Sequence, residues 1–396
     1  MHVRFLARGA AAELRARYGG ALAAEDAARL AGAAEALVLV VRDPVAASAL
    51  ELVRGCGAEV ARAGGATGEI TETLIATTRG ALDRARASAH GEDAAFVAAL
   101  IAAFERAAEP AASLRVRDRV LDLRGEARVM GIVNVTPDSF HERAAGVDEA
   151  VAQARAMVAD GAAIVDVGGQ SYSAASGRIS ADEERARVVP AVRALLAARL
   201  GAVLSIDTYT AAVADAALAA GAHLVNDCSG LSDPALPDVV AKHGAALVVM
   251  HLKGRLNVRE PQTYVYRDAL AEIVDFLYER TERAVRGGVA RDAIVVDPGL
   301  EFGKEPPTDL EILERFGELR ALGYPILFAS SRKTFIGRVL GLPSSELLAP
   351  SLATATIGIA AGARIVRVHD VRETVRLVRM LAAVRDPRTP AAEPRG

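Results

Sequence analysis

RVMGIVN (128–134), VDEAVAQARAMVADG (147–161) and AAIVDVG (162–168) form the stretch that decides the fold of this chain. The first and third segments are apolar nearly throughout, which is typical of strands buried on both faces of a parallel sheet. The middle segment is longer and amphipathic, as expected of a helix that covers such a sheet. The stretch therefore predicts one strand–helix–strand unit.

This rhythm continues downstream until eight apolar runs have passed. The six further runs are AVLSID (202–207), AHLVND (222–227), ALVVMH (246–251), AIVVDP (293–298), PILFAS (325–330) and RIVRVH (364–369). Helical stretches such as RETVRLVRMLAAV (372–384) lie between them. Eight such units in one domain favour an α/β fold of the (β/α)8 barrel type over an open doubly wound sheet.

A domain boundary is expected between residues 108 and 120, where an Ala-rich helical pattern gives way to alternating residues. Upstream, the apolar run ALVLVVRD (36–43) and its helical flanks predict a smaller α/β domain with a structural, dimerising or regulatory role. The length of 396 residues suits a barrel of roughly 250 residues plus such a unit. We expect an N-terminal domain over 1–115, the barrel over 116–386 and a disordered tail over 387–396.

Composition narrows the class of protein. The formal net charge of -3 gives no reason to expect a nucleic acid or a membrane as partner. Cys56 and Cys228 are the only cysteines, so a disulfide framework is not expected and a reducing compartment fits. The first twenty residues contain Arg and Glu within their apolar runs and predict neither a signal peptide nor a membrane span. We therefore expect a cytoplasmic protein.

Polar residues end the apolar runs, and their types are those that bind ligands or do chemistry. They are Asn134, Asp166, Asp207, Asn226 with Asp227, His251, Asp297, Ser331 to Lys333, and Arg367 with His369. In a barrel these positions converge at the C-terminal mouth, where active sites of this fold lie. The alternative is that they only cap the following helices. Lys, Arg and His are poor caps, so the whole set favours a site, although His251 is better explained as a core histidine.

The residue types at the mouth indicate the kind of ligand. The carboxylates of Asp207 and Asp297 can accept hydrogen bonds from an amino-pyrimidine edge, and Asn226 can both donate and accept. Arg367, His369 and Asn134 form a separate group suited to a phosphate-type oxyanion and its Mg2+. The predicted ligand is a donor-rich heterocycle beside a phosphate.

Eight motifs of this chain, in the same order, resemble those of the dihydropteroate synthase family. They are MGIVNVTPDSF (130–140), DVGGQS (166–171), SIDT (205–208), NDCSG (226–230), MHLKG (250–254), DPGLEFGK (297–304), SSRKTFIG (330–337) and RVHDV (367–371). The resemblance covers about residues 118 to 384. The pieces NVTPDSF, SRK-x-FIG and RVHDV are specific to that family, whereas related pterin-binding methyltransferases share residues like SIDT and DPG.

The resemblance implies a role for each motif residue. The pterin ring would be held by Asp207, Asn226 and Asp297, with Asp166, Met250, Phe302 and Lys333 near it; Phe140 and Thr334 would border 4-aminobenzoate; Arg367 and His369 would bind diphosphate; and Asn134 would place Mg2+. The implied reaction releases diphosphate from (7,8-dihydropterin-6-yl)methyl diphosphate, and the aromatic amine captures the resulting cation. Lys333, Asp207, Asp297, Arg367 and His369 would be the catalytic set. The resemblance also implies a homodimer.

Three departures from the family pattern bear on activity. The usual Glu-Ser-Thr-Arg-Pro-Gly after DVGG is replaced from Gln170 onward, the glycines after TPDSF are lost, and Glu301 stands where the family has Gly. We hypothesise that Arg178 supplies the missing cation, that Tyr172 lies against the aminobenzoate ring, and that Glu142 supplies the acid of the first loop. Arg178 is otherwise a solvated residue before a helix that starts near Ser180. The altered loop keeps open a pterin-binding homologue without synthase activity, while SRK and RVHDV disfavour a methyltransferase.

Overall fold

The structure, a computed structural model, describes residues 3–6, 26, 28, 30, 37–41, 45–64, 70–108, 111–135, 143–170, 179–254, 256 and 264–386. The chain forms two compact units. One consists of Met1–Pro110 together with Arg315–Gly323, and the other of Ala111–Glu314 and Tyr324–Gly396. The sequence analysis places residues 315–323 in the predicted barrel. In the structure they belong to the first unit, which the sequence does not predict.

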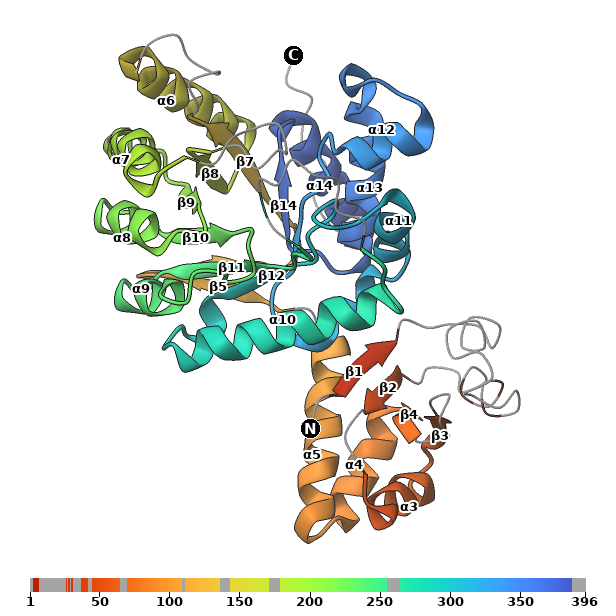
Figure 1. Cartoon of the computed structure of the whole chain (residues 1–396). Coiled ribbons are helices and arrows are strands. Elements are labelled where there is room, and N and C mark those ends of the chain that lie inside the picture. The colour runs from red at the N-terminus through yellow and green to blue at the C-terminus, as the bar shows by residue number, and fades with distance from the viewer. Residues whose placement is uncertain are drawn as a thin grey trace. The chain divides into compact units, whose positions relative to one another are not determined.

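The second unit is built on an eight-stranded parallel sheet (Figure 1). Its strands are β7 (Arg128–Asn134), β8 (Ile164–Gly168), β9 (Val203–Asp207), β10 (Leu224–Asp227), β11 (Ala246–Met250), β12 (Ile294–Asp297), β13 (Leu327–Phe328) and β14 (Ile365–Val368). They follow the order β12-β11-β10-β9-β8-β7-β14-β13, and a parallel bridge between Val296 and Ile326 joins the two ends. The predicted (β/α)8 barrel is confirmed, and each predicted apolar run contains one of its strands.

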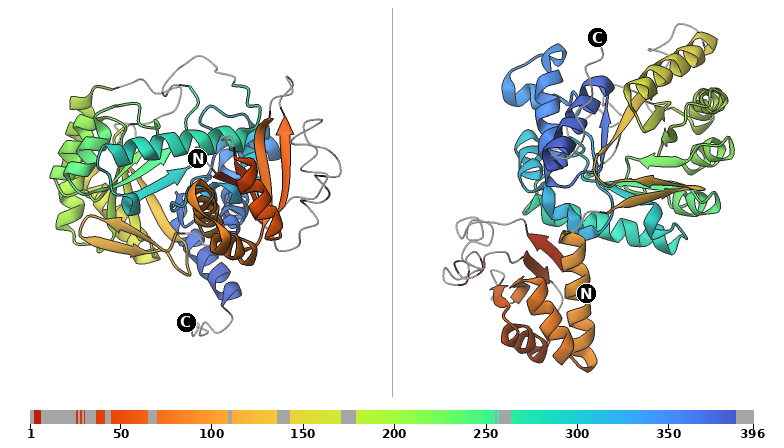
Figure 2. Two further views of the ribbon diagram at one scale, coloured as in Figure 1. Left: turned by 90° about the horizontal axis from the view of Figure 1, so that it is seen from below. Right: turned by 180° about the vertical axis from the view of Figure 1, so that it is seen from behind.

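Helices surround these strands on the outside (Figures 1 and 2). They are α6 (Arg143–Asp160), α7 (Ala181–Ala197), α8 (Ala211–Ala219), α9 (Leu236–Lys242), α10 (Ala269–Arg286), α11 (Pro306–Glu314), α12 (Thr334–Leu340), α13 (Leu348–Ala361) and α14 (Val371–Arg385), with short 3-10 turns η3 (Arg291–Ala293) and η5 (Ser344–Glu346). In the part of the chain that the structure describes, no helix has the length and apolar character needed to cross a membrane.

An apolar layer fills the barrel toward the N-terminal ends of its strands. Its strand residues are Met130, Ile164, Val203, Leu224, Ala246, Val248, Val295, Leu327 and Ile365, all buried in one cluster. A hairpin of β5 (Ser113–Val116) and β6 (Arg119–Asp122) adds Leu114 and Val116 to the same cluster. The hairpin therefore covers the N-terminal ends of the strands and leaves the C-terminal ends as the mouth.

The first unit contains a four-stranded antiparallel sheet in the order β1-β2-β4-β3. Its elements are β1 (Val3–Leu6), β2 (Leu37–Val41), α3 (Ala47–Gly55), β3 (Glu59–Gly64), β4 (Ile70–Thr77), α4 (Arg79–Ser88), α5 (Gly91–Ala108) and the 3-10 turn η4 (Phe316–Leu322). Strand β2 lies within the predicted run ALVLVVRD, and the expected smaller α/β domain is confirmed. Its core joins Leu39, Leu50, Leu82 and Leu100 from four elements.

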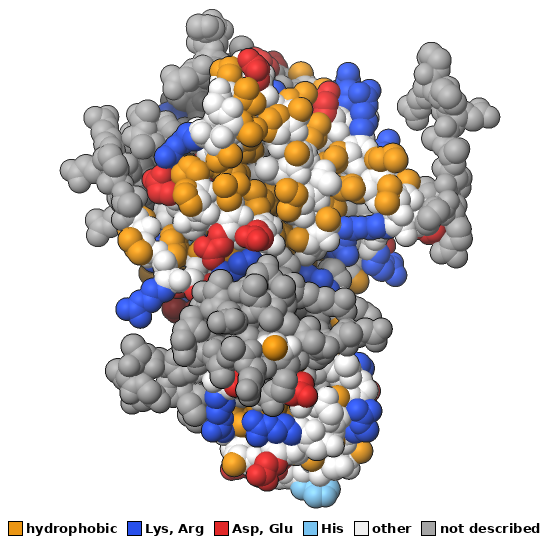
Figure 3. Space-filling model, turned by 90° about the vertical axis from the view of Figure 1, so that its right-hand side faces the viewer, with side chains coloured by type: hydrophobic (Ala, Val, Ile, Leu, Met, Phe, Trp, Pro, Cys, Tyr) orange, Lys and Arg blue, Asp and Glu red, His pale blue; other side chains and the backbone are white. Residues whose placement is uncertain are grey.

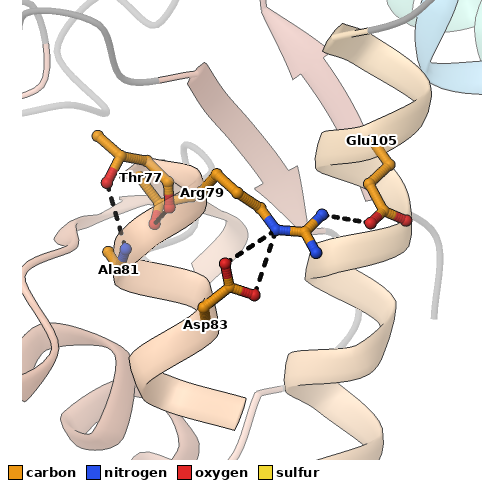
Figure 4. Close-up of polar contacts among 6 residues, drawn as sticks. Thr77, Arg79, Ala81, Asp83 and Glu105 are labelled. Atoms are coloured by element: carbon orange, nitrogen blue, oxygen red, sulfur yellow. Dashed lines mark hydrogen bonds and ion pairs between the residues drawn. The ribbon is translucent and has the colours of Figure 1, made fainter.

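Polar contacts tie α4 to α5 within this unit (Figure 4). The hydroxyl of Thr78 accepts from the backbone N–H of Ala81 at 3.3 Å and caps the start of α4. Arg79 donates to Asp83 on its own helix at 3.2 Å and to Glu105 on α5. These three charged side chains are 41 to 56% exposed, so the network adds little stability.

Candidate active site

A polar layer follows the apolar layer of the barrel, toward the C-terminal ends of the strands. Strand side chains alternate between the two faces of a sheet, so the residue two positions beyond each interior residue also points inward. Two positions beyond Ile164, Val203, Leu224, Val248, Val295 and Ile365 stand Asp166, Ser205, Asn226, Met250, Asp297 and Arg367. The alternation thus delivers carboxylates, an amide and a guanidinium to the mouth.

Arg367 joins two of the carboxylates at this mouth. Its Nε donates to Asp166 Oδ2 at 2.7 Å, and a terminal nitrogen donates to Asp207 Oδ2 at 2.7 Å. Asp166 also accepts from Asn226 Nδ2 at 2.9 Å and from the Ser205 hydroxyl at 2.5 Å. Burial alone lowers the pKa of Arg367, but the two carboxylates outweigh burial and raise it above the ordinary value.

This pairing differs from the grouping expected from the sequence. Arg367 was expected beside His369 and Asn134, apart from the carboxylates. In the structure it contacts Asp166 and Asp207, while His369 contacts Ser331 with its Nδ1 3.1 Å from the hydroxyl. Burial lowers the pKa of His369, and the positive charge of Arg367 lowers it further. Arg367 therefore links the group expected to hold pterin with the group expected to hold diphosphate.

Asp297, at the end of β12, and Lys333, directly before α12, are close enough to influence each other electrostatically. Asp297 is 4% exposed, and its Oδ1 accepts from the backbone N–H of Gly299 at 2.7 Å. Burial raises the pKa of this carboxyl, although the nearby Lys333 opposes the shift. Burial likewise lowers the pKa of Lys333, opposed by Glu301 and Asp297. Lys333 also donates to the carbonyl of Leu300, and its ammonium lies 4.7 Å from the centre of the Phe302 ring.

Glu301 has a backbone conformation that explains why the family has glycine at this position. Its φ is 69°, in the left-handed region that favours glycine. Its side chain makes contacts that glycine cannot make, because Oε1 accepts from the Thr334 hydroxyl and from the Phe335 backbone N–H, each at 2.6 Å. The departure thus brings a carboxylate to Thr334, a contact that the motif alone does not reveal.

Lys304 is a buried residue of the site region that the sequence reasoning missed, although it ends the quoted motif DPGLEFGK. Its ammonium donates to the carbonyls of Gly299 at 2.6 Å and Phe302 at 2.9 Å, and lies 2.9 Å from His251 Nδ1. Burial lowers the pKa of Lys304 and holds the pKa of His251 well below its usual value. His251 is 3% exposed, so it lies in the core and acts on the site only through its neighbours.

The remaining predicted residues are placed as follows. Met250 ends β11 and packs with Tyr209, Cys228 and Phe302. Asn134 ends β7, and its side-chain oxygen lies 3.3 Å from where a Cβ on Gly168 would stand, with Gly168 in register between Asn134 and Asp207. Asp227 accepts from the N–H groups of Ser229 and Leu231 and therefore shapes the loop after β10. Phe140, Glu142, Tyr172 and Arg178 lie outside the described residues.

Comparison with known proteins decides the family. The family model described as "Pterin binding enzyme" matches residues 130–369. The chain belongs to this family. Within it, the chain is 39% identical to the dihydropteroate synthase of Bacillus subtilis over 274 residues, which are 68% of this chain and 93% of that protein. The chain is thus a dihydropteroate synthase-type transferase, and the resemblance read from its motifs is confirmed.

Two further relatives add to this comparison. The "Inactive dihydropteroate synthase 2" of Mycobacterium tuberculosis is 40% identical over 276 residues, covering 68% of this chain and 86% of that protein. The solved structure of Xanthomonas albilineans dihydropteroate synthase with 4-aminobenzoic acid matches with a TM-score of 0.65 and 35% identity. It covers 69% of this chain and 98% of that one. Family membership alone therefore includes both synthases and a relative named inactive.

Proposed function

We propose that this chain condenses (7,8-dihydropterin-6-yl)methyl diphosphate with 4-aminobenzoate to give 7,8-dihydropteroate and diphosphate, as a step of folate biosynthesis. The observation that carries the proposal is the polar layer of the barrel mouth, where Asp166, Asp207 and Asn226 are bonded in one network with Arg367. The carboxylates of this layer can accept hydrogen bonds from a donor-rich ring, and the guanidinium can bind the anion that leaves.

Pterin recognition is assigned to Asp207, Asn226 and Asp297. Asp207 and Asn226 are direct neighbours in the register of β9 and β10, and Asp297 pairs with Met250 two strands further. Carboxylate oxygens accept hydrogen bonds from ring N–H and amino groups, and the amide of Asn226 can both donate and accept. Asp166, bonded to Asn226 and Arg367, positions the side chains that contact the ring.

The leaving diphosphate is assigned to Arg367 and His369. The bond between the methylene carbon and the diphosphate oxygen breaks, the amine nitrogen forms the new bond to that carbon, and the nitrogen then loses a proton. Arg367 would shift from Asp207 toward the diphosphate, which balances the charge that develops there. The freed carboxylate would then face the pterin ring.

Magnesium fits this end of the mouth. Among the residues that the structure describes, no group of three His, Cys, Asp or Glu side chains forms a ready metal site. Mg2+ nevertheless binds phosphate oxygens and waters with only one or two protein ligands. The side-chain oxygen of Asn134, beside Gly168 at the end of β7, fits that limited role. When bound, Mg2+ would neutralise part of the negative charge of the diphosphate.

The second substrate is assigned to the side of the mouth that carries Lys333 and Thr334. Thr334 is exposed, and its hydroxyl donates to Glu301. A benzoate carboxylate beside Thr334 would therefore meet the negative charge of Glu301. This charge, together with the relative named inactive, supports the alternative of a pterin-binding homologue without synthase activity.

We further propose that the chain forms a homodimer and works in the cytoplasm. Hydrophobic side chains gather on the barrel face that carries α11, α12 and α13 (Figure 3). Leu310, Val339, Leu340 and Ile357 on these helices are 44 to 54% exposed. An apolar patch of this kind marks an interaction surface. Within the described part of the chain, neither Cys56 nor Cys228 is in a disulfide, which fits a reducing compartment.

The proposed diphosphate contact is tested by Arg367→Lys. Lysine keeps the charge but lacks the planar fork that binds an oxyanion through two nitrogens. Isothermal titration should show binding of pterin diphosphate weakened by about tenfold or more, as expected for losing a charge-assisted hydrogen bond, with binding of the pterin lacking diphosphate changed far less. Arg372→Lys, on an exposed pair with Asp160, is the matched control. Equal losses for both ligands would refute the assignment of Arg367.

A further inference from the structure

Two adjoining cavities lie at the N-terminal end of the barrel, at the opposite ends of β9 and β10 from Asp207 and Asn226. The first has a volume of about 240 Å³ and is lined mainly by apolar side chains, namely Val165, Leu195, Leu196, Leu200, Val203 and Leu204. The second has a volume of about 530 Å³ and is lined mainly by basic ones, namely Arg115, Arg117, Arg119, His223 and His243. Arg119 and His223 line both cavities. The two cavities therefore meet at this pair.

His223 presents a hydrogen-bond donor at this junction. Its side chain is 7% exposed, and its Nδ1 accepts from the backbone N–H of Leu204 at 2.9 Å. Burial lowers the pKa of His223, and Arg119 and Arg117 lower it further, so the ring is neutral near pH 7. With Nδ1 accepting, the ring proton is on Nε2. Among the described residues, none accepts a hydrogen bond from Nε2.

Two guanidinium groups beside His223 lack a carboxylate partner within the described part of the chain. Arg117, at the turn of the hairpin, donates through one nitrogen to the carbonyls of Leu218 at 3.2 Å and Ala222 at 2.9 Å. Arg119 is exposed, and its guanidinium makes no hydrogen bond or ion pair with any residue that the structure describes. These carbonyl contacts satisfy one nitrogen of the Arg117 guanidinium without neutralising its charge.

The other basic residues of the second cavity differ from these two. Arg115 donates to Asp292 at 3.0 Å, and His243 lies 2.7 Å from Asp215. Asp118 in the hairpin turn is the one carboxylate among the residues that line either cavity. The junction therefore carries a net positive charge contributed by Arg117 and Arg119, next to a buried neutral donor and an apolar recess.

We propose that this end of the barrel is a second ligand site, which binds a small molecule with one acidic group on an apolar or aromatic body. The acidic group, a phosphate or a carboxylate, accepts from His223 Nε2 and Arg119, while the body enters the recess beside Leu195 and Leu204. Hydrogen bonds from cations to such anions are among the strong ones. The site is separate from the mouth and does not depend on the proposed synthase activity.

The test is isothermal titration of the full chain with phenyl phosphate, benzoate and inorganic phosphate at one fixed ionic strength. We expect Arg119→Ala to weaken phenyl phosphate or benzoate binding at one site by about tenfold or more, since a charge-assisted hydrogen bond is lost. Arg193→Ala, which removes an exposed arginine of α7 that lines neither cavity, should leave binding unchanged. Whichever of the two aromatic probes binds more tightly identifies the acidic group.

A second variant tests the apolar recess. Ala202 lines the first cavity but not the second, so Ala202→Leu should fill the recess and weaken both aromatic probes while sparing inorganic phosphate. Arg367→Ala distinguishes probe binding at the mouth from probe binding at the second site, because this variant should leave the second site intact. If Arg367→Ala abolishes all anion binding, or if Arg119→Ala and Arg193→Ala behave alike, the proposal is overturned.

Discussion

Asp297 is a buried carboxyl whose ionisation destabilises the fold. Burial raises its pKa above the value in the unfolded chain, so the folded protein binds this proton more tightly than the unfolded chain does. The stability contributed by the protonated form is therefore present at low pH and lost as the pH rises through the folded pKa. A buried carboxyl with a raised pKa at the barrel mouth is typical of active-site groups, which supports the proposed role of Asp297 in pterin binding.

Asp297→Asn should accordingly stabilise the protein at pH 7 while weakening pterin binding. The asparagine oxygen can still accept from the Gly299 N–H, and no charge remains to be buried. We expect a higher Tm at pH 7, by about 2 to 4 °C for each kcal/mol gained, and a smaller difference below pH 4. Differential scanning calorimetry across this pH range checks the prediction. A lower Tm of the variant at pH 7 would show that Asp297 stabilises the fold.

Glu301 is the residue at which this chain departs most informatively from its family. Its carboxylate accepts from Thr334 and Phe335. Glu301→Gln keeps an oxygen at this place and removes the charge. If the benzoate carboxylate binds beside Thr334, the variant should lower the KM for 4-aminobenzoate by about threefold or more, since nearby like charges repel by on the order of 1 kcal/mol at an exposed site. The KM for pterin diphosphate should not change.

Glu305→Gln is the matched control for this substitution. Glu305 is a nearby exposed carboxylate that pairs with Arg338 and does not contact Thr334. Steady-state kinetics of both variants separate the local contact from a general charge effect. An equal fall of KM in the two variants would mean that Glu301 acts only through the overall field of the mouth.

At the scale of elements, the loop after β12 is fixed against the loop after β11 by close backbone contacts. Gly299 and Gly303 both have positive φ, 64° and 68°. A Cβ on Gly299 would stand 2.0 Å from the carbonyl oxygen of His251, and one on Gly303 would stand 1.9 Å from that of Lys253. Lys304 donates to two carbonyls of the same loop, those of Gly299 and Phe302. The position of the Phe302 ring against the Lys333 ammonium therefore depends on these glycines.

Gly299→Ala should therefore destabilise the fold well beyond the ordinary cost of a left-handed alanine, which is about 1 to 2 kcal/mol. Gly125 is the matched control, since its φ is 71° and a Cβ there meets nothing within 4 Å. Chemical denaturation of Gly299→Ala and Gly125→Ala measures the difference in the free energy of unfolding. Equal losses would show that the loop yields to the clash.

The strands of the barrel could be predicted from the sequence because they are buried on both faces. RVMGIVN coincides with β7, and the seven later runs each contain a strand. The strands of the first unit are harder to predict, because strands such as β3, EVARAG (59–64), mix charged and small residues and give no continuous apolar run. Strand β2, by contrast, lies within the continuous apolar run ALVLVVRD and can be predicted.

The contents of the site could be predicted, but its pairings could not. Each apolar run ends in a recognisable polar residue, so the residues that gather at the mouth can be predicted from the sequence. The contact of Arg367 with Asp166 depends on which strands are neighbours and which residues share a layer, and 201 positions separate the two in the chain. Likewise, the positive φ of Glu301 is a property of the folded loop and not of the residue type.

At the scale of the whole molecule, the apolar face on α11 to α13 predicts self-association. Leu340 is 54% exposed and Ile357 is 46% exposed on this face. The double variant Leu340→Glu and Ile357→Glu should be monomeric by light scattering, because buried charges without partners are costly at an interface. Met380→Glu and Val384→Glu on α14 are the control, since they replace even more exposed apolar residues outside α11 to α13 and should leave the dimer intact. A monomeric wild type would remove the basis for the dimer.

The first unit sets a condition on experiments with the whole chain. Because Arg315–Gly323 belongs to that unit and Ala321 lies in its core cluster, deleting the first 110 residues would remove the partners of η4. Activity and binding are therefore best measured on the full chain. The role of this unit as a structural, dimerising or regulatory part stays a prediction.

Diphosphate release from (7,8-dihydropterin-6-yl)methyl diphosphate, followed with purified full-length protein and Mg2+, tests the proposed reaction most directly. The assay is run with and without 4-aminobenzoate, and 7,8-dihydropteroate is quantified in the same samples. We expect release that depends on 4-aminobenzoate and equals the product formed, mole for mole. Tight binding of the pterin diphosphate with no dihydropteroate formed would contradict the synthase assignment and establish a pterin-binding homologue without that activity.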